Sequence, residues 1–346
     1  MSAKKSTSAY AAAGVDIDEM MSGLEAIKKD VKSTRTDGVL SEIGQFGGLF
    51  QSPGRGSILV ASTDGVGTKL KVANLADKHD TIGQCLVNHC VNDILTQGAR
   101  PLFFLDYLGT AKLTSKVFSA VVRGLCKACR ENGCALLGGE TAEMPGLYPP
   151  GEYDLVGTIV GAVEKRKLVT GETLRAGDAL IGLPSSGLQT NGYSLARKIL
   201  LEEQGLKVTD LFPGTRRTVG SILLAVHRSF LPAVEAVEAA GVRIRGMSHI
   251  TGGGLIDNLP RMLPDGLDAV IDLTSWKVPH VFQFMQEKGG VDPEEMFRVF
   301  NMGIGYVIAV RDKDAARAVD ALAEAKQKPV CLGIIDEGNG KVRFLA

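Results

Sequence analysis

The segment ILVASTDGVGTKLKVA places an acid, two glycines and two lysines at the end of an apolar run. Asp64 offers a carboxylate, and Gly65 and Gly67 let backbone N–H groups approach a ligand closely. Thr68 and Lys69 supply donors and positive charge that suit phosphate. The order of residues differs from the G-x-x-x-x-G-K-[ST] phosphate loop. The segment therefore predicts a strand that ends at a phosphate site, with a plain Asp-Gly turn as the structural alternative.

A second group of polar residues lies on a helix that the sequence predicts over 81–98. Apolar residues cover most of its circumference, which predicts a helix buried nearly all round. Asn88, His89 and Asp93 lie on this helix, and buried polar groups need partners. Either they form an internal hydrogen-bond network, or they line a metal or nucleotide site. We favour the second for Asp93, and expect His89 to support the ligands rather than to be one.

A third acid follows an apolar run in GCALLGGETAEMPG. Gly138 and Gly139 precede Glu140, which repeats the theme of an apolar strand followed by glycines and an acid. Asp64, Asp93 and Glu140 would give Mg²⁺ the hard oxygen ligands that it prefers, with water and phosphate oxygens completing an octahedron. We therefore predict that these three carboxylates converge on one Mg²⁺ ion.

A glycine cluster in the second half offers a separate anion site. Gly252, Gly253 and Gly254 follow His249 and precede a short predicted helix. Bare backbone N–H groups at the start of a helix attract anions, and a close strand–helix turn is the alternative. Asn191, in the loop PSSGLQTNGYS, either caps the next helix or joins a binding site. One anion-friendly loop in each half suits one nucleotide triphosphate and one phosphorylated substrate.

The elements that carry these loops fall into two groups. Strands and helices alternate up to about residue 165, and the pattern restarts near 168–175. We predict two mixed α/β domains, 1–170 and 171–346, with an α+β fold because strict β-α-β order is missing. Longer helices are expected at 114–132, 218–240 and 313–326.

Composition excludes several classes of function. The chain has 346 residues, and its 39 basic and 39 acidic residues give no net charge, so we expect no nucleic-acid partner. No apolar run approaches the length of a membrane span, and the N-terminal residues lack the apolar core of a secretory signal. We expect a cytoplasmic protein. Cys126 and Cys129 have metal-site spacing but no second pair, and helical spacing places them on the buried side of a helix.

Seven segments together resemble phosphoribosylaminoimidazole synthetase, the phosphoribosylformylglycinamidine cyclo-ligase family of purine biosynthesis. They occur in the family's order from about residue 10 to the end: AGVDID, TDGVGTK, CVNDILTQGARPLFFLDY, GGETAEMPGLY, TNGYSLARKIL, HITGGG and FNMGIG. The resemblance implies ATP-dependent ring closure of formylglycinamidine ribonucleotide to 5-aminoimidazole ribonucleotide. ATP would phosphorylate the amide oxygen, and the neighbouring amidine nitrogen would then displace phosphate.

The resemblance also implies cofactors, partners and roles. ATP and Mg²⁺ are the expected cofactors, with Asp64, Asp93 and Glu140 on the metal and Gly65, Gly67, Thr68, Lys69, Asn88, Gly138 and Gly139 around the nucleotide. A homodimer is expected, with N-terminal strands forming a β-barrel across the interface and a C-terminal sheet with flanking helices. The arm around AGVDID and GGLF would cover the nucleotide.

The ribonucleotide phosphate is expected beside Asn191 and the three glycines, with His249 close by. Lys69, Asp93 and His249 are the expected catalytic residues.

One departure from the family pattern concerns catalysis. The family reads H-T-N-G-Y-S where this chain has Gln189, and glutamine cannot exchange a proton at neutral pH. Two alternatives therefore stay open: a catalytically weakened nucleotide-binding dimer, and another ATP-using enzyme of the same superfamily.

Overall fold

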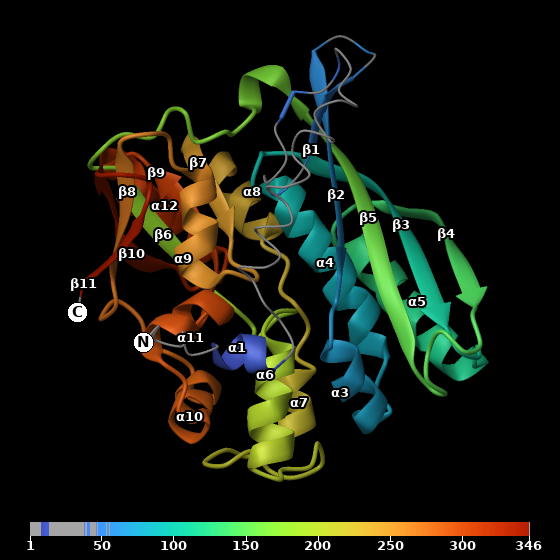
Figure 1. Cartoon of the computed structure of the whole chain (residues 1–346). Coiled ribbons are helices and arrows are strands. Elements are labelled where there is room, and N and C mark those ends of the chain that lie inside the picture. Colours follow the sequence, from blue (N-terminus) through green and yellow to red (C-terminus); the bar gives the residue numbers. More distant parts are fainter. Residues whose placement is uncertain are drawn as a thin grey trace, which may run out of the picture.

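The structure is a computed structural model that describes residues 8–13, 38, 40–41, 46, 48–52, 54 and 56–345. Two β-sheets with their helices lie side by side (Figure 1). Most of the arm that we expected over the nucleotide lies outside the described residues, including 14–18 of AGVDID. Residues 8–13 carry the short helix α1 (Ala9–Ala12), whose first N–H groups donate to the Glu295 carboxylate.

The first sheet has five strands in the order β1-β2-β5-β3-β4. Its strands are β1 (Gly48–Gln51), β2 (Ser57–Gly65), β3 (Arg100–Thr110), β4 (Ala135–Glu143) and β5 (Tyr153–Glu164). Neighbours are antiparallel except β3 and β4, which are parallel and joined by a helical crossover. The sheet is open in the described residues, with β1 and β4 as its edges, so one chain alone does not form the expected barrel.

Helices cover one face of this sheet (Figure 1). They are α3 (Lys69–Ala76), α4 (Asp80–Leu95) and α5 (Ser115–Glu131). Buried residues alternate along β5, and the buried set faces these helices. All residues of α4 from Thr81 to Leu95 are buried, which confirms the prediction of a helix enclosed on all sides. Helix α4 thus lies at the centre of the molecule, where its polar side chains must find partners.

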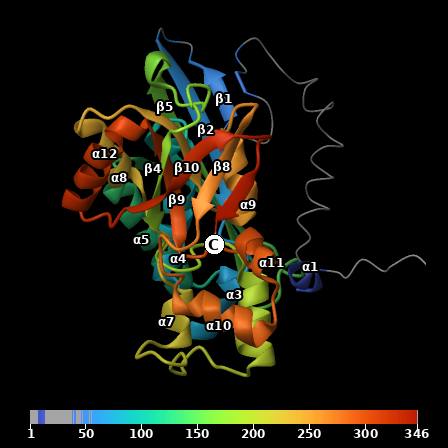
Figure 2. The ribbon, with the colours of Figure 1, turned by 90° about the vertical axis from the view of Figure 1, so that its left-hand side faces the viewer.

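The second sheet has six strands in the order β11-β8-β10-β6-β9-β7. They are β6 (Ala179–Pro184), β7 (Ile244–His249), β8 (Leu267–Asp272), β9 (Ile304–Val310), β10 (Val330–Glu337) and β11 (Val342–Leu345). Helices flank both faces, with α8 (Leu231–Ala239) and α12 (Asp312–Glu324) on one side and α9 (Gly254–Asn258) on the other (Figure 2). The mixed α/β fold with two sheets is confirmed, whereas the boundary near residue 170 stays a prediction.

The remaining helical segments are short. They are η1 (Lys165–Lys167), α6 (Tyr193–Arg197), η2 (Lys198–Glu203), α7 (Val219–Leu223), α8 (Leu231–Ala239), α9 (Gly254–Asn258), η3 (Leu259–Met262), α10 (His280–Gly289), α11 (Pro293–Val299) and α12 (Asp312–Glu324). The expectation of one helix over 218–240 is wrong, because the chain leaves helical structure between α7 and α8. This break lets His227 enter the interior, where it is fully buried.

Candidate active site

Asp64 lies near the end of β2 with its side chain on the helix-covered face. The side chain is 42% exposed, and its Oδ2 lies 2.7 Å from His89 Nε2 on α4. Burial opposes ionisation of Asp64, but the charge and hydrogen bonding of His89 outweigh it and lower the pKa of this carboxyl. For His89, burial opposes the imidazolium, yet Asp64 raises its pKa to about 9. The pair is therefore an ion pair that faces solvent only at Asp64.

Asp93 lies deeper, one helical turn beyond His89. Its Oδ1 lies 2.8 Å from His249 Nδ1 at the end of β7, and its Oδ2 accepts a hydrogen bond of 3.0 Å from the Ser62 hydroxyl. Asp93 and His249 are both buried. The structure thus brings Asp64, Asp93 and His249, predicted from three distant segments, into one region, with His89 between the two carboxylates.

A third histidine completes this region. His227 Nε2 lies 3.0 Å from His249 Nε2, and His227 Nδ1 lies 3.2 Å from Thr190 Oγ1. Thr190 Oγ1 also lies 2.5 Å from His89 Nδ1. Burial, followed by the charges of His249 and His89, lowers the pKa of His227 well below its usual value. His227 was not predicted from the sequence; a histidine in the otherwise apolar run SILLAVH was the available signal.

Lys69 does not reach a phosphate site. Its side chain is fully buried, and Nζ donates hydrogen bonds of 2.7 Å to the carbonyl oxygens of Gln189 and Ala225. Nζ also lies 3.2 Å from Cys85 Sγ. Lys69 is the first residue of α3 and is turned inward, away from the loop that precedes it. The structure therefore gives this lysine a packing role between the two halves, at variance with the expected catalytic and nucleotide contacts.

Asn88 is also committed to internal contacts. Its Nδ2 donates to the carbonyl oxygen of His227 at 2.7 Å, and its Oδ1 accepts from Asn132 Nδ2 at 2.8 Å. Both functional groups of this buried amide are satisfied. Of the two interpretations of the polar residues on α4, the internal network describes Asn88, which is not placed to contact a cofactor.

The carboxylate of Glu140 is separated from the other two acids. Gly138, Gly139 and Glu140 lie inside β4 rather than in the expected turn. Strands β5 and β3 lie between β2 and β4, so about 14 Å separates the strands that carry Asp64 and Glu140. Gly139 shares a row with Asp64, and alternation turns Glu140 to the opposite face. The predicted three-carboxylate Mg²⁺ site therefore does not form within one chain.

The loop after Asp64 is partly exposed, with Gly67 open to solvent and Val66 buried. Gly65 N–H donates to the Asp64 carboxylate at 2.7 Å, and Gly67 has a φ of 54° that favours glycine. Thr68, immediately before α3, has its hydroxyl 3.2 Å from that of Ser194 in α6. This loop thus joins the start of α3 to the second half of the chain.

Gly252, in the glycine cluster of the second half, lies beside Asn191, its predicted neighbour. A Cβ placed on Gly252 would lie 3.4 Å from Asn191 Nδ2, so these two residues are adjacent. A Cβ on Gly254 would lie 1.9 Å from the Phe297 carbonyl oxygen. Glycine is required at Gly254 by close packing, while Gly252 and Asn191 border the same space.

Gln189 occupies a buried and strained position. Its φ is 63°, and it is 1% exposed. Within the described residues, neither Oε1 nor Nε2 of its side chain has a hydrogen-bond partner. An unsatisfied buried amide is costly, and burial also keeps this side chain from water.

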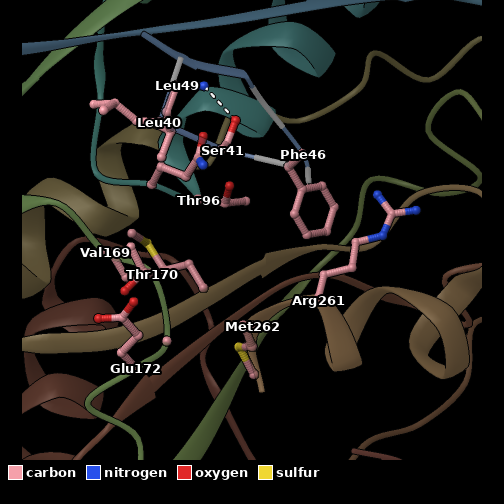
Figure 3. A pocket seen from close by; sticks show the side chains of 13 residues that line it. Leu40, Ser41, Phe46, Leu49, Thr96, Val169, Thr170, Glu172, Arg261 and Met262 are labelled. Carbon is pink, nitrogen blue, oxygen red and sulfur yellow. Dashed lines mark hydrogen bonds between the residues drawn. The ribbon is translucent and has the colours of Figure 1, made fainter. Parts of the chain in front are cut away.

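A cavity of about 260 Å³ lies between the N-terminal arm and the second half (Figure 3). Arg261 enters it from η3, with its guanidinium 4.7 Å from the centre of the Phe46 ring. Glu172 approaches from the opposite side (Figure 3). Gln97 also lines the cavity, and its Oε1 has no hydrogen-bond partner in the described part of the chain. The cavity thus carries one cationic and one anionic side chain.

Cysteines and helices add two further findings. Cys129 is buried and Cys126 partly buried on α5, and no disulfide joins any of the cysteines, all of which are described. No helix in the described ranges is both long and apolar enough to cross a membrane.

Comparisons with known proteins agree over most of the chain. Residues 47–163 and 175–345 match the N-terminal and C-terminal domains of AIR synthase related protein. The chain is 48% identical over 336 residues to the phosphoribosylformylglycinamidine cyclo-ligase of Bacillus pumilus, covering 96% of each chain. It is 52% identical over 327 residues to that of Sorangium cellulosum, covering 94% of each.

Solved structures share the fold at low identity. Thiamine-monophosphate kinase from Stenotrophomonas maltophilia has a TM-score of 0.62 at 18% identity, covering 93% of this chain and 95% of that one. The hydrogenase maturation protein HypE in complex with ATP has a TM-score of 0.60 at 18% identity, covering 96% and 92%. The family models and the curated relatives confirm the resemblance seen in the sequence: the chain belongs to the AIR synthase family and, within it, to the phosphoribosylformylglycinamidine cyclo-ligases.

Proposed function

We propose that this chain uses ATP to close the ring of formylglycinamidine ribonucleotide, giving 5-aminoimidazole ribonucleotide in de novo purine biosynthesis. The observation that carries this proposal is the near 50% identity to named cyclo-ligases over almost the entire chain. Purine biosynthesis suits a cytoplasmic location. Asp64, Asp93 and His249 come together near the ends of β2 and β7, which is where we propose the reaction takes place.

The reaction balances as a phosphoryl transfer followed by an intramolecular substitution. The γ-phosphoryl group of ATP is transferred to the formyl oxygen of the substrate, which makes that oxygen a good leaving group. The amidine nitrogen attacks the formyl carbon, phosphate leaves with the former formyl oxygen, and one proton is lost. Because the nucleophile belongs to the same molecule, orientation supplies much of the rate. Positioning and charge stabilisation are then the main tasks of the protein.

Asp64 is the residue best suited to a Mg²⁺–ATP complex. Its carboxylate is partly exposed, and Gly67 in the loop beside it is exposed as well. Bound Mg²⁺ would neutralise charge on the triphosphate. Asp93 is less suited, because both of its oxygens are engaged by His249 and Ser62. We therefore assign Asp64 to the nucleotide's metal and regard Asp93 as a buried partner of His249.

The ribonucleotide phosphate is assigned to Gly252 and Asn191, which border one space. Gly253→Val is expected to weaken ribonucleotide binding at least tenfold while ATP binding changes less than twofold, because φ is 98° at this glycine and a Cβ would lie 2.7 Å from Asp257 Cβ. Calorimetry with each ligand separately measures both. Arg261→Met is the comparison variant. If Arg261→Met removes ribonucleotide binding and Gly253→Val does not, the phosphate lies in the cavity of Figure 3 instead.

A homodimer is supported by the uncovered face of the first sheet. Leu105 is 38% exposed there, and Ala61 and Val160 share this face. Exposed apolar patches of this kind mark interaction surfaces. Pairing of two such faces would complete a barrel and would bury Glu140 at the interface, where it faces the partner chain.

The alternative is a nucleotide-binding dimer with weakened catalysis, favoured by the unpartnered amide of Gln189. ATP hydrolysis with and without formylglycinamidine ribonucleotide separates the two functions. Substrate-dependent release of ADP with equimolar aminoimidazole ribonucleotide supports the cyclo-ligase. ATP binding with no substrate-dependent turnover supports the alternative, and Gln189→His would then be expected to restore turnover.

A further inference from the structure

A cleft of about 530 Å³ lies where the two halves of the chain are joined. One wall is the segment 166–173, which follows β5 and crosses to the second sheet (Figure 1). The other wall consists of Glu238, near the end of α8, and of residues 242–245 at the start of β7. The two family domains match residues 47–163 and 175–345, so the first wall belongs to neither of them.

The cleft is remote from the proposed nucleotide site. Glu164, just before the first wall, pairs with Ser57 at the start of β2, whereas Asp64 lies near the other end of that strand. From Ser57 to Asp64 the extended strand spans about 23 Å. The second wall shows the same separation, because Arg245 lies at the start of β7 and His249 at its end. A ligand in the cleft would therefore not overlap Mg²⁺–ATP.

Cationic side chains line both walls of the cleft. Arg166 and Lys167 lie on the first wall, and Arg243 and Arg245 lie on the second. Glu238 also lines the cleft, but Arg100 already pairs with it. The chain as a whole has no net charge, so this concentration of positive charge is a local feature.

Acidic neighbours balance only part of that charge. Glu164 pairs with both Arg166 and Lys167, and Asp178 pairs with Arg245. Together with Arg100, Arg243 and Glu238, the region holds five cationic and three acidic side chains, a surplus of two positive charges. A phosphate monoester carries a charge of about −1.5 to −2 at neutral pH and would match this surplus.

Hydrogen-bond donors for a phosphate are free in the cleft. Arg243 is exposed and makes no hydrogen bond or ion pair within the described residues. Arg245 contacts Asp178 through Nη1, which leaves Nε and Nη2 without partners in that part of the chain. The guanidinium group presents its donors in a planar fork that suits phosphate oxygens. Thr170 and Thr173 also line the cleft and carry hydroxyl groups.

The cleft has room for more than a phosphate group. Its volume lies within the range of small-molecule sites, and Leu168, Val169 and Val242 add apolar surface to its walls. We propose that the cleft binds a nucleoside monophosphate, with the phosphate on Arg243 and Arg245 and the nucleoside against the apolar side chains. Because its walls come from the connecting segment and from β7, the bound ligand would hold the two halves in one arrangement.

The test uses the full chain with its nucleotide site filled by Mg²⁺ and a non-hydrolysable ATP analogue. Calorimetry with AMP as the probe is expected to show one site per chain, with weaker binding at high salt. Adenosine, which lacks the phosphate, and ribose 5-phosphate, which lacks the base, are each expected to bind about tenfold more weakly or worse. Arg243→Met is expected to weaken AMP binding about tenfold. Arg216→Met, at an exposed arginine outside the cleft, is the matched control.

Amide hydrogen exchange locates the bound AMP. Exchange is expected to slow in residues 166–173 and 242–245 and to stay unchanged in 62–69. The proposal is overturned if AMP does not bind beside the ATP analogue, if adenosine or ribose 5-phosphate binds as tightly as AMP, if Arg243→Met and Arg216→Met behave alike, or if only residues 62–69 are protected. Because Arg243 has no partner in the described residues, its replacement is expected to leave the fold intact, which circular dichroism checks. These readouts need no turnover, so a negative result leaves ring closure untouched.

Discussion

The two faces of the first sheet carry different functions although their residues alternate along the same strands. The helix-covered face carries Asp64 toward His89 and α4. The uncovered face carries Glu140 and the exposed Leu105. Successive residues along a strand point to opposite faces of the sheet, so a shift of one residue moves a side chain from one face to the other. An acid beside glycines at the end of a strand therefore joins the site only when strand register turns it inward, as it does at Asp64 and not at Glu140.

The largest expected effect is on the helix-covered face. Asp64→Asn keeps the size of the side chain and removes the charge that would hold Mg²⁺–ATP, so turnover is expected to fall about 10²–10³-fold. Steady-state rates at saturating Mg²⁺ and ATP measure this, with circular dichroism and sedimentation as controls for fold and assembly. A fully active variant would remove Asp64 from the nucleotide site.

The uncovered face is tested by assembly rather than by chemistry. Leu105→Asp places a charge in the proposed dimer interface, where a buried unpaired carboxylate is costly. The dimer dissociation constant is expected to rise about 30-fold or more. Analytical ultracentrifugation over a concentration series measures it. Leu211→Asp, at a residue that is 62% exposed and outside the sheet, is the matched control. Unchanged dimerisation in Leu105→Asp would place the interface elsewhere.

The ion pair of Asp64 and His89 on the helix-covered face makes the free energy of unfolding depend on pH. Asp64 raises the pKa of His89 from 6.5 to about 9. The contribution of protonated His89 to the stability of the fold is therefore complete below pH 6.5 and is lost as pH rises through 9. The free energy of unfolding is expected to decline over this window by at most about 3 kcal/mol. Burial lowers the pKa values of His227 and His249, whose contribution is lost instead as pH falls below 6.5.

Urea unfolding at pH 6.5, 8 and 9.5 measures the alkaline decline. His89→Gln is expected to flatten it, and His79→Gln, at a histidine whose pKa burial lowers, is expected to leave it in place. Parallel profiles for wild type and His89→Gln would show that the Asp64–His89 pair contributes nothing to stability.

The smallest expected effect is that of Glu140→Gln. Because this carboxylate points away from Asp64, the variant is expected to lose only a few-fold in turnover and to keep its affinity for Mg²⁺–ATP. Titration of ATP at fixed Mg²⁺ compares it with Asp64→Asn. A loss as large as that of Asp64→Asn would show that Glu140 reaches a nucleotide site, and therefore that a second chain brings it there.

Sequence reasoning found the elements with strong periodicity and the acids at their ends. The enclosed helix α4 follows the prediction. Asp64 and Asp93, two of the three acids expected to converge, both lie near His89, but the approach of His249 to Asp93 was not predicted. Glu140 was misplaced because the spacing of residues does not reveal that β5 and β3 lie between β4 and β2. Lys69 was misplaced because the rotation of α3 decides which way its first side chain points.

His227 was missed for a different reason. It lies 138 positions after His89 in the sequence, and only the break between α7 and α8 brings it to Thr190. The expected continuous helix over 218–240 hid this turn. Long-range contacts of this kind depend on how the two sheets pack together, which local patterns do not encode.

The central claim, phosphorylation of the formyl oxygen before ring closure, is tested most directly by an isotope. Formylglycinamidine ribonucleotide labelled with ¹⁸O in the formyl group is converted with ATP, and the inorganic phosphate is analysed by mass spectrometry. The account predicts one ¹⁸O atom in each phosphate released. Aminoimidazole ribonucleotide formed with unlabelled phosphate, or ATP hydrolysed without product, would contradict it.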